Sequence, residues 1–174
     1  MKKTYVMPLL VLTIICLAVS AALAFMNSVT EPVISAAAAQ RAQAVMADKL
    51  PEATGFEPVE FLGLEGIPAS INEIYKTTND IGYILIAAVN GFSGDITVIC
   101  AVDNNGVIIS TSTLSHTETR GIGTIIEQES FLDTFSGADN RLDGVDTVTG
   151  ATISTRAFIH AIDDILTAFR IVTQ

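Results

Sequence analysis

An uncharged run of 22 residues, Tyr5 to Met26, constrains this chain more than any other feature of its sequence. With a rise of ~1.5 Å per residue, a helix of this length reaches about 33 Å, which is enough to cross the hydrocarbon core of a bilayer. Pro8 falls in the first turn of the run, where a missing N–H does least harm. The run therefore predicts one transmembrane helix over residues 5–26.

The charges beside this run predict its orientation. Positive residues tend to stay in the cytoplasm, so Lys2 and Lys3 place residues 1–4 inside and the remainder of the chain on the extracytoplasmic side of the cytoplasmic membrane. A cleaved signal peptide is the main alternative, because Ala22-Leu23-Ala24 offers a small-x-small cleavage pattern. We favour a retained single-pass anchor, since the usual apolar region of a signal peptide is only ~7–15 residues long. A lipoprotein site at Cys16 is disfavoured by the bulky Ile15 before it.

Beyond the run the chain is acidic. Residues from Asn27 onward carry 7 basic and 19 acidic side chains, a net charge of −12. Such a surface repels phosphate backbones, which argues against nucleic-acid binding. The two cysteines, Cys16 and Cys100, lie in the apolar run and in a predicted strand, so we expect neither a disulfide nor a metal site from them.

Residues 27–54 are expected to form a helical stalk segment that continues the membrane helix or packs on the outer domain. Thr30 is the predicted N-cap of a new helix, with Glu31 near its positive end and Pro32 in its first turn. An alanine-rich helix follows over Val33–Leu50, and Pro51 ends it.

Residues 55–174 form the predicted outer domain, of α+β class. The segment Asp103-Asn104-Asn105-Gly106 predicts a hairpin, and short turns between strands imply an antiparallel sheet. A packed amphipathic helix is expected over Thr152–Val172, with Phe158, Ile162, Ile165 and Phe169 on one stripe. The candidate strands are Val59–Leu64, Ile71–Thr77, Gly82–Val89, Asp95–Val102 and Val107–Thr113.

The segment before this helix is the richest in possible chemistry. Gly150 and Ala151 leave room for a bulky group to approach the backbone, while Thr152, Ser154 and Thr155 offer hydroxyls. The first N–H groups of a helix are unpaired, so a phosphate there would meet free donors and the positive end of the helix dipole. The alternative is an ordinary Ser/Thr-rich helix start with nothing bound.

A resemblance to a known family bears on this choice. Asp146-Thr147-Val148-Thr149-Gly150-Ala151-Thr152 resembles the flavinylation motif Asp-x-x-Thr-Gly-Ala-Thr of the FMN-binding domain family. The segments Gly82-Tyr83, Gly91-Phe92-Ser93-Gly94, Val102-Asp103 and Gly106-Val107-Ile108 resemble the family in order and spacing. His116-Thr117-Glu118-Thr119-Arg120-Gly121-Ile122-Gly123 is similar to the family's His-x-Glu-Thr-Pro-Gly-Leu-Gly loop, with Arg120 in place of the proline. Phe92-Ser93 stands where Tyr-Gly is common.

The resemblance implies FMN attached through its phosphate to the hydroxyl of Thr152, by a separate FMN transferase that uses FAD as donor and Mg²⁺ as electrophile. The family includes the G subunit of the Rnf electron-transport complex and the C subunit of the sodium-translocating NADH:quinone oxidoreductase. It therefore implies a redox-relay subunit, not catalytic alone, of a membrane-bound Rnf-type complex that couples ferredoxin and NAD⁺ to ion movement. A stand-alone membrane-anchored FMN carrier outside the cell and a non-redox anchored binding module remain the alternatives.

The resemblance also implies which residues contact the FMN, whereas no catalytic residue and no metal ligand is assigned. The loop that contains His116 is expected to close over the flavin, with Gly121 and Gly123 supplying tight turns and Ile122 an apolar contact. His160 is expected to face solvent, Asp143 to serve a turn, and Asp146 to serve transferase recognition or capping. The expected FMN-binding residues are Thr149, Gly150, Ala151, Thr152, Ile153, Ser154, His116, Glu118, Thr119, Gly121, Ile122 and Gly123.

Overall fold

The structure is a computed structural model of the 174-residue chain and describes residues 3–61, 63–139, 142 and 144–173. The chain divides into two compact units, residues 1–42 and residues 43–174. Helix α1 (Lys3–Lys49) begins in the first unit and ends in the second, and residues 50–174 follow in the second unit.

The first unit consists of the greater part of α1. Its stretch Met7–Ile34 is long and apolar enough to cross a membrane, and the side chains of that stretch are not buried against protein. The expected new helix start at Thr30 is wrong, because α1 runs unbroken through Thr30, Glu31 and Pro32. The Thr30 hydroxyl donates to the Met26 carbonyl at 3.0 Å instead of capping a helix. The expected end before Pro51 is confirmed, since α1 ends at Lys49.

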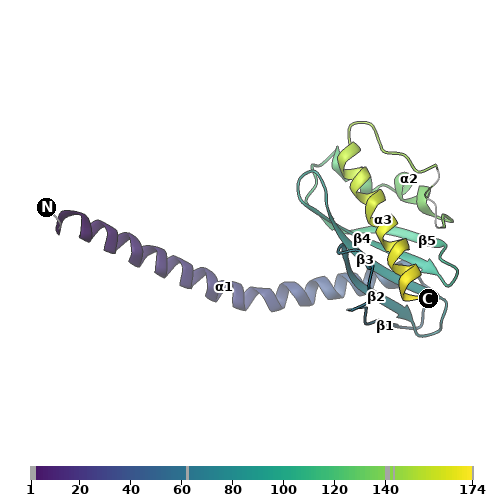
Figure 1. Ribbon diagram of the computed structural model, residues 1–174, viewed down its shortest axis with the longest axis horizontal. Coiled ribbons are helices and arrows are strands. Elements are labelled where there is room, and N and C mark those ends of the chain that lie inside the picture. The colour runs from purple at the N-terminus through teal and green to yellow at the C-terminus, as the bar shows by residue number, and fades with distance from the viewer. Residues whose placement is uncertain (1–2, 62, 140–141, 143, 174) are drawn as a thin grey trace. The chain divides into compact units, whose positions relative to one another are not determined.

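The second unit is built on a five-stranded antiparallel sheet in the order β1-β2-β3-β4-β5, so each strand pairs with its neighbour in sequence (Figure 1). The α+β class is thereby confirmed. The strands are β1 (Phe56–Pro58), β2 (Ile71–Thr77), β3 (Gly82–Asn90), β4 (Asp95–Asp103) and β5 (Ile108–His116).

The connection between β4 and β5 shows how the sequence sets this register. Between β4 and β5, Asp103 Oδ1 accepts the backbone N–H groups of Asn105 and Val107, each at 2.8 Å. Gly106 has a φ of +86°, which explains the glycine there and confirms the predicted hairpin.

The expected strand Val59–Leu64 is wrong. The ladder begins earlier, at Phe56, and the chain leaves the sheet before Gly63, whose φ of +105° does not fit a strand.

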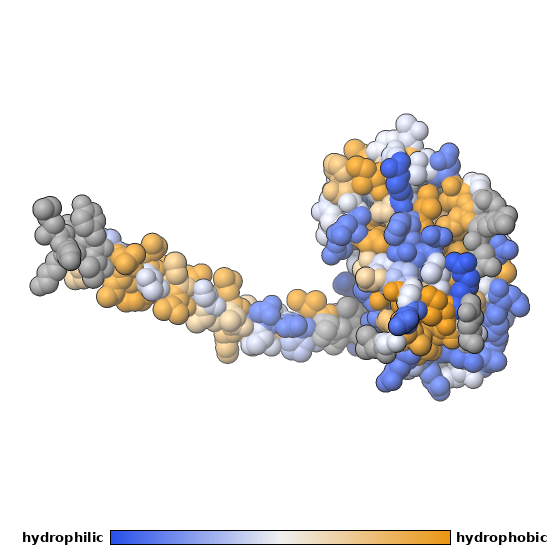
Figure 2. All heavy atoms as spheres, in the orientation of Figure 1, coloured by the Kyte–Doolittle hydropathy of each residue, from blue (hydrophilic) through white to orange (hydrophobic). Residues whose placement is uncertain are grey.

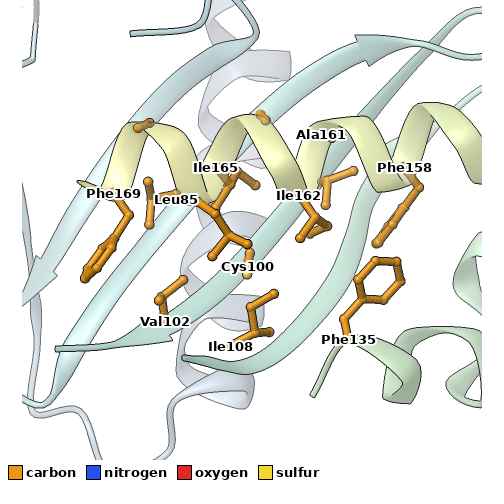
Figure 3. Packing of buried hydrophobic residues seen from close by; sticks show 14 of the residues in the cluster. Leu85, Cys100, Val102, Ile108, Phe135, Phe158, Ala161, Ile162, Ile165 and Phe169 are labelled. Carbon is orange, nitrogen blue, oxygen red and sulfur yellow. The ribbon is translucent and has the colours of Figure 1, made fainter. Parts of the chain in front are cut away.

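Helix α3 (Thr152–Val172) covers one face of the sheet, over the range that the sequence predicts. The four apolar residues of its expected stripe are buried: Phe158, Ile162, Ile165 and Phe169. Figure 3 shows these side chains on the side of α3 that faces the sheet residues Leu85, Cys100 and Val102, with Phe158 directed toward Phe135. The opposite face is buried too, at Ile84, Ile86, Ile99 and Ala101, and the end of α1 in this unit contributes the buried Met46.

Among the described residues between β5 and α3, three short helices complete the core, and they were not predicted. They are the 3₁₀ helix η1 (Gly123–Glu127), the single turn α2 (Glu129–Leu132) and the 3₁₀ helix η2 (Asp133–Phe135). Phe131 and Phe135 from the last two pack against Phe158 of α3, with ring centroids 5.4 and 5.2 Å apart. This aromatic cluster fixes the first half of α3 and therefore the position of Thr152.

We predict that Phe158→Ala lowers the free energy of unfolding of the full-length protein by about 3–5 kcal/mol, because it empties the centre of this cluster. The measurement is denaturant unfolding in detergent micelles. Leu64→Ala is the control, since Leu64 is 46% exposed and its loss changes little packing. Equal effects of the two substitutions would contradict the described core.

Candidate functional site

A cavity of about 350 Å³ lies at the end of the second unit where α3 begins. Three segments form its wall: the loop between β3 and β4, the loop after β5, and the first turn of α3. The residues that line it are Phe92, Glu118, Thr119, Ile122, Gly123, Gly150, Ala151, Thr152, Ile153 and Ser154.

The mouth of the cavity is apolar although it faces solvent. Phe92, Ile122 and Ile153 are 67%, 55% and 54% exposed, and each comes from a different one of the three segments. Hydrophobic residues gather on the surface near the start of α3 in Figure 2. Exposed apolar residues that converge on a concave surface are typical of a ligand or partner site.

Glu118 connects the three segments of the cavity wall through hydrogen bonds to its carboxylate. Its Oε1 accepts the backbone N–H groups of Phe92 at 2.8 Å and Ser93 at 3.0 Å, and its Oε2 accepts the Ser154 hydroxyl at 2.6 Å. The residue is only 6% exposed. Burying a carboxylate is costly unless donors satisfy it, and three donors do so here.

Two glycines make room for this carboxylate. A Cβ added at Gly91 would collide with Glu118 Oε1, and one added at Gly123 would lie 2.6 Å from Glu118 Oε2. Neither glycine has a positive φ, so close approach rather than backbone strain explains them. Gly121 does have a positive φ, +79°, which fits one of the two tight turns that the resemblance implies in this loop, at Gly121 and Gly123.

The carboxyl of Glu118 is ionised at neutral pH. Burial raises its pKa, but the hydrogen bonds from the Ser154 hydroxyl and from the N–H groups of Ser93 and Phe92 outweigh burial. The pKa therefore lies below its ordinary value.

His116 supports the loop from outside the cavity. Its Nδ1 accepts the Glu118 N–H at 3.0 Å, which assigns the ring proton to Nε2, and Nε2 lies 2.9 Å from Glu127 Oε1. His116 thus orients the backbone of Glu118, and it does not line the cavity.

The first turn of α3 offers free donors at the cavity wall. Its N-cap is Ala151, which has no side chain able to accept a hydrogen bond, so the first N–H groups of the helix are uncapped. Gly150, with a φ of +91°, turns the chain into the helix. Thr155 secures this turn, because its hydroxyl accepts the Val148 N–H at 3.2 Å and donates to the Ala151 carbonyl at 3.0 Å.

Thr152 occupies the first position of the helix and is half-buried on the cavity wall. Its hydroxyl has no hydrogen-bond partner among the residues that the structure describes, whereas Ser154 and Thr155 nearby both use theirs within the protein. Thr152 is therefore the hydroxyl of this turn that is available to an external group.

The structure brings nine of the twelve expected FMN-binding residues to one cavity, and Thr149, His116 and Gly121 do not line it. Sequence reasoning missed Phe92 as a wall residue. A signal was present, because Phe92 stands in a Gly-Phe-Ser-Gly turn at a hairpin end, where a large apolar side chain has no core to enter.

Other expected side chains lie apart from the cavity. Asp146 does not cap α3, because its carboxylate accepts the Thr147 N–H and the N-cap is Ala151. His160 is solvent-facing as expected, with its Nδ1 3.3 Å from Asp164 Oδ2. Cys100 is buried in β4, where burial raises the pKa of its thiol. Asp143 lies outside the described residues.

Because the pKa of Glu118 is lowered in the folded state, the stability that its carboxylate contributes is present above its unfolded pKa of about 4.3 and is lost as pH falls through the folded value. We predict that Glu118→Gln reduces the fall in the free energy of unfolding between pH 7 and pH 3. The same substitution lowers the free energy of unfolding at pH 7 by about 1–3 kcal/mol. Denaturant unfolding of the full-length protein between pH 3 and 7 measures both. The control is Glu60→Gln, at an exposed residue. The same pH dependence of the free energy of unfolding in both variants would refute the role of Glu118.

Comparison with known proteins agrees with the resemblance in the motifs. The G subunit of the ion-translocating oxidoreductase complex of Vibrio parahaemolyticus is 42% identical over 89 residues, which are 43% of this chain and 42% of that protein. The protein of the same name from Methanosarcina acetivorans is 27% identical over 163 residues and 87% of each chain. The G subunit of the proton-translocating ferredoxin:NAD(+) oxidoreductase complex of Clostridium ljungdahlii is 30% identical over 101 residues, 51% of this chain and 54% of that one. The chain thus spans about half or less of the Vibrio and Clostridium proteins.

A solved structure shares the fold. The crystal structure of Shewanella oneidensis NqrC matches with a TM-score of 0.53 and 15% identity, over 72% of this chain and 85% of that one. Residues 91–167 of this chain, which contain the whole wall of the cavity, match the FMN-binding domain family, and the chain is similar to the G subunits of ion-translocating oxidoreductase complexes.

Proposed function

We propose that this chain is the FMN-carrying redox subunit of a membrane-bound, Rnf-type ion-translocating oxidoreductase complex, with the FMN attached by a phosphoester to Thr152. The observation that carries the proposal is the free hydroxyl of Thr152. It stands at an uncapped helix start, on the wall of a cavity whose mouth is apolar.

The residues present fit the ring of FMN. The flavin ring is flat and largely apolar, and Phe92, Ile122 and Ile153 offer it apolar surface from three directions. The cavity volume of about 350 Å³ lies in the range of small-molecule sites, roughly 300–1,000 Å³. FMN bound there would supply one- and two-electron transfer.

The start of α3 fits the phosphate. The uncapped N–H groups of the first turn and the positive end of the helix dipole favour a negative group beside Thr152. A cap from Asp146 would compete with that group, and Asp146 instead bonds the Thr147 N–H. The space beside Gly150 is open, since nothing lies within 4 Å of the position that a Cβ there would take.

Attachment requires a second protein, in our proposal an FMN transferase that uses FAD and Mg²⁺. The Thr152 oxygen forms a bond to the phosphorus of the FMN half of FAD, and the bond between the two phosphates breaks. AMP leaves, and the hydroxyl proton is released. A covalent bond also prevents loss of the cofactor outside the cell, where rebinding of dilute FMN is slow.

The names of the relatives support the proposed complex. The names of the Vibrio, Methanosarcina and Clostridium proteins place each of them in an ion-translocating or proton-translocating oxidoreductase complex. The sequence of this chain has two cysteines and no glycine-rich nicotinamide fingerprint, so we assign it neither an iron–sulfur cluster nor NAD⁺. It therefore passes electrons between other subunits of the complex.

The apolar stretch of α1 is the proposed anchor. Met7–Ile34 is long enough to span a bilayer, and Lys2 and Lys3 precede it. We propose that the N-terminus lies in the cytoplasm and the flavin-carrying unit on the other side, in accordance with the positive-inside rule.

We predict that the purified full-length protein, coexpressed with an FMN transferase, gives a fluorescent band in a denaturing gel and gains the mass of one FMN less one water. Thr152→Ala removes both signals, because it removes the oxygen that forms the ester. Thr167→Ala, a hydroxyl deletion on the same helix and away from the cavity, keeps both. A dark wild-type band in the presence of the transferase would refute the attachment.

We also predict the orientation. Alkaline phosphatase fused after Gln174 is active in intact cells, because its disulfides form only outside the cytoplasm. Green fluorescent protein fused at the same point by the general secretory route stays dark. The reverse pattern would contradict the topology drawn from Lys2 and Lys3.

A further inference from the structure

Glu118 carries a negative charge with no cation among the described residues in direct contact, although a protonated His116 acts on it through space. Its three partners, the N–H groups of Phe92 and Ser93 and the Ser154 hydroxyl, are all neutral. Within the described part of the chain, its carboxylate forms no ion pair. The charge is held at the wall of the cavity in a residue that is 6% exposed, so solvent screens it less than a surface charge.

The other acidic groups near this loop differ from Glu118. Glu127 has a side chain that is 54% exposed, and it lies against His116 rather than on the cavity. Asp146 is exposed and does not line the cavity. Glu118 is thus the one carboxylate among the described lining residues, and its charge acts on whatever the cavity holds.

An electron that enters the cavity adds a negative charge unless a proton from solvent accompanies it. A fixed negative charge nearby opposes that addition, and the opposition is stronger in a partly buried site than in water. We infer that the carboxylate of Glu118 lowers the reduction potential of FMN held in this cavity. The inference rests on the proposed function, since it requires FMN at this site.

Glu118 also positions the walls of the cavity. Its hydrogen bonds tie the Phe92 loop and the start of α3 together, so a variant that loosens them could shift the potential through geometry alone. The test must separate charge from geometry. Glu118→Gln does this, because the amide oxygen still accepts the N–H groups of Phe92 and Ser93, and its NH₂ group donates to the Ser154 hydroxyl. Ser154→Ala removes the 2.6 Å hydrogen bond and keeps the charge.

The experiment is a spectroelectrochemical titration of the full-length flavinylated protein and the two variants at one pH. We expect a positive shift of the FMN midpoint potential in Glu118→Gln, and no positive shift in Ser154→Ala. An unchanged potential in Glu118→Gln, or the same positive shift in both variants, would overturn the inference. Intact mass measured on the same samples separates the two proposals, because a wild type that binds FMN without covalent attachment contradicts the phosphoester and still gives a potential to compare with those of the variants.

A second measurement needs no variant. Coupling is reciprocal, so if the charge of Glu118 opposes reduction, reduction raises the pKa of Glu118 by the same free energy. Carbon-13 NMR of labelled glutamate carboxyls in the oxidised and reduced wild type reports this pKa. Glu127, which also faces this loop, is followed in the same spectra. His116 and the adjacent Arg120 are followed in matched samples labelled at histidine and arginine. A rise on reduction supports the inference, and an unchanged pKa overturns it.

Discussion

The site depends on one buried carboxylate. Glu118 accepts hydrogen bonds from a hairpin loop some 25 residues before it and from a helix 36 residues after it, and so joins segments that no local sequence signal connects. Moving a carboxylate out of water costs several kcal/mol, which its three donors offset only while all three segments stay in place. Positions 91 and 123 require glycine because the Glu118 carboxylate occupies the space that a side chain there would take.

The sheet and α3 form the platform that holds these segments. The core lies between α3 and one face of the sheet, and the aromatic cluster around Phe158 fixes the helix two turns from Thr152. The cavity forms where this helix begins, beside the β3–β4 loop and the end of β5. Its exposed Phe92, Ile122 and Ile153 do not belong to the hydrophobic core, and the proposed flavin would account for their position.

The sequence allowed the larger elements to be predicted because their signals are local. The apolar stripe of α3 and the Asp103–Gly106 turn each depend on residues close together in the chain. The new helix at Thr30 was wrong because a threonine in a long helix bonds the carbonyl four residues earlier as readily as it caps. The strand at Val59–Leu64 was wrong because Gly63 within it and Gly66 after it have positive φ and take the chain out of the sheet.

The site could be predicted only in part. The motif around Thr152 and the loop after β5 are local patterns, and the structure brings most of their residues to one cavity. The burial of Glu118 depends on the Phe92 loop and on Ser154, so it is a tertiary fact that no single segment reveals. The same holds for the free hydroxyl of Thr152, which stands out only because its neighbours Ser154 and Thr155 are engaged.

The central claim is that a flavin phosphate is esterified to this one hydroxyl. Fragmentation mass spectrometry of proteolytic peptides from the native, flavinylated protein tests it most directly. The account predicts a single modified peptide, with fragment ions that place the whole FMN mass on Thr152. Its mass on Thr149, Ser154 or Thr155, or on no residue of a protein that nevertheless binds FMN, would contradict the account.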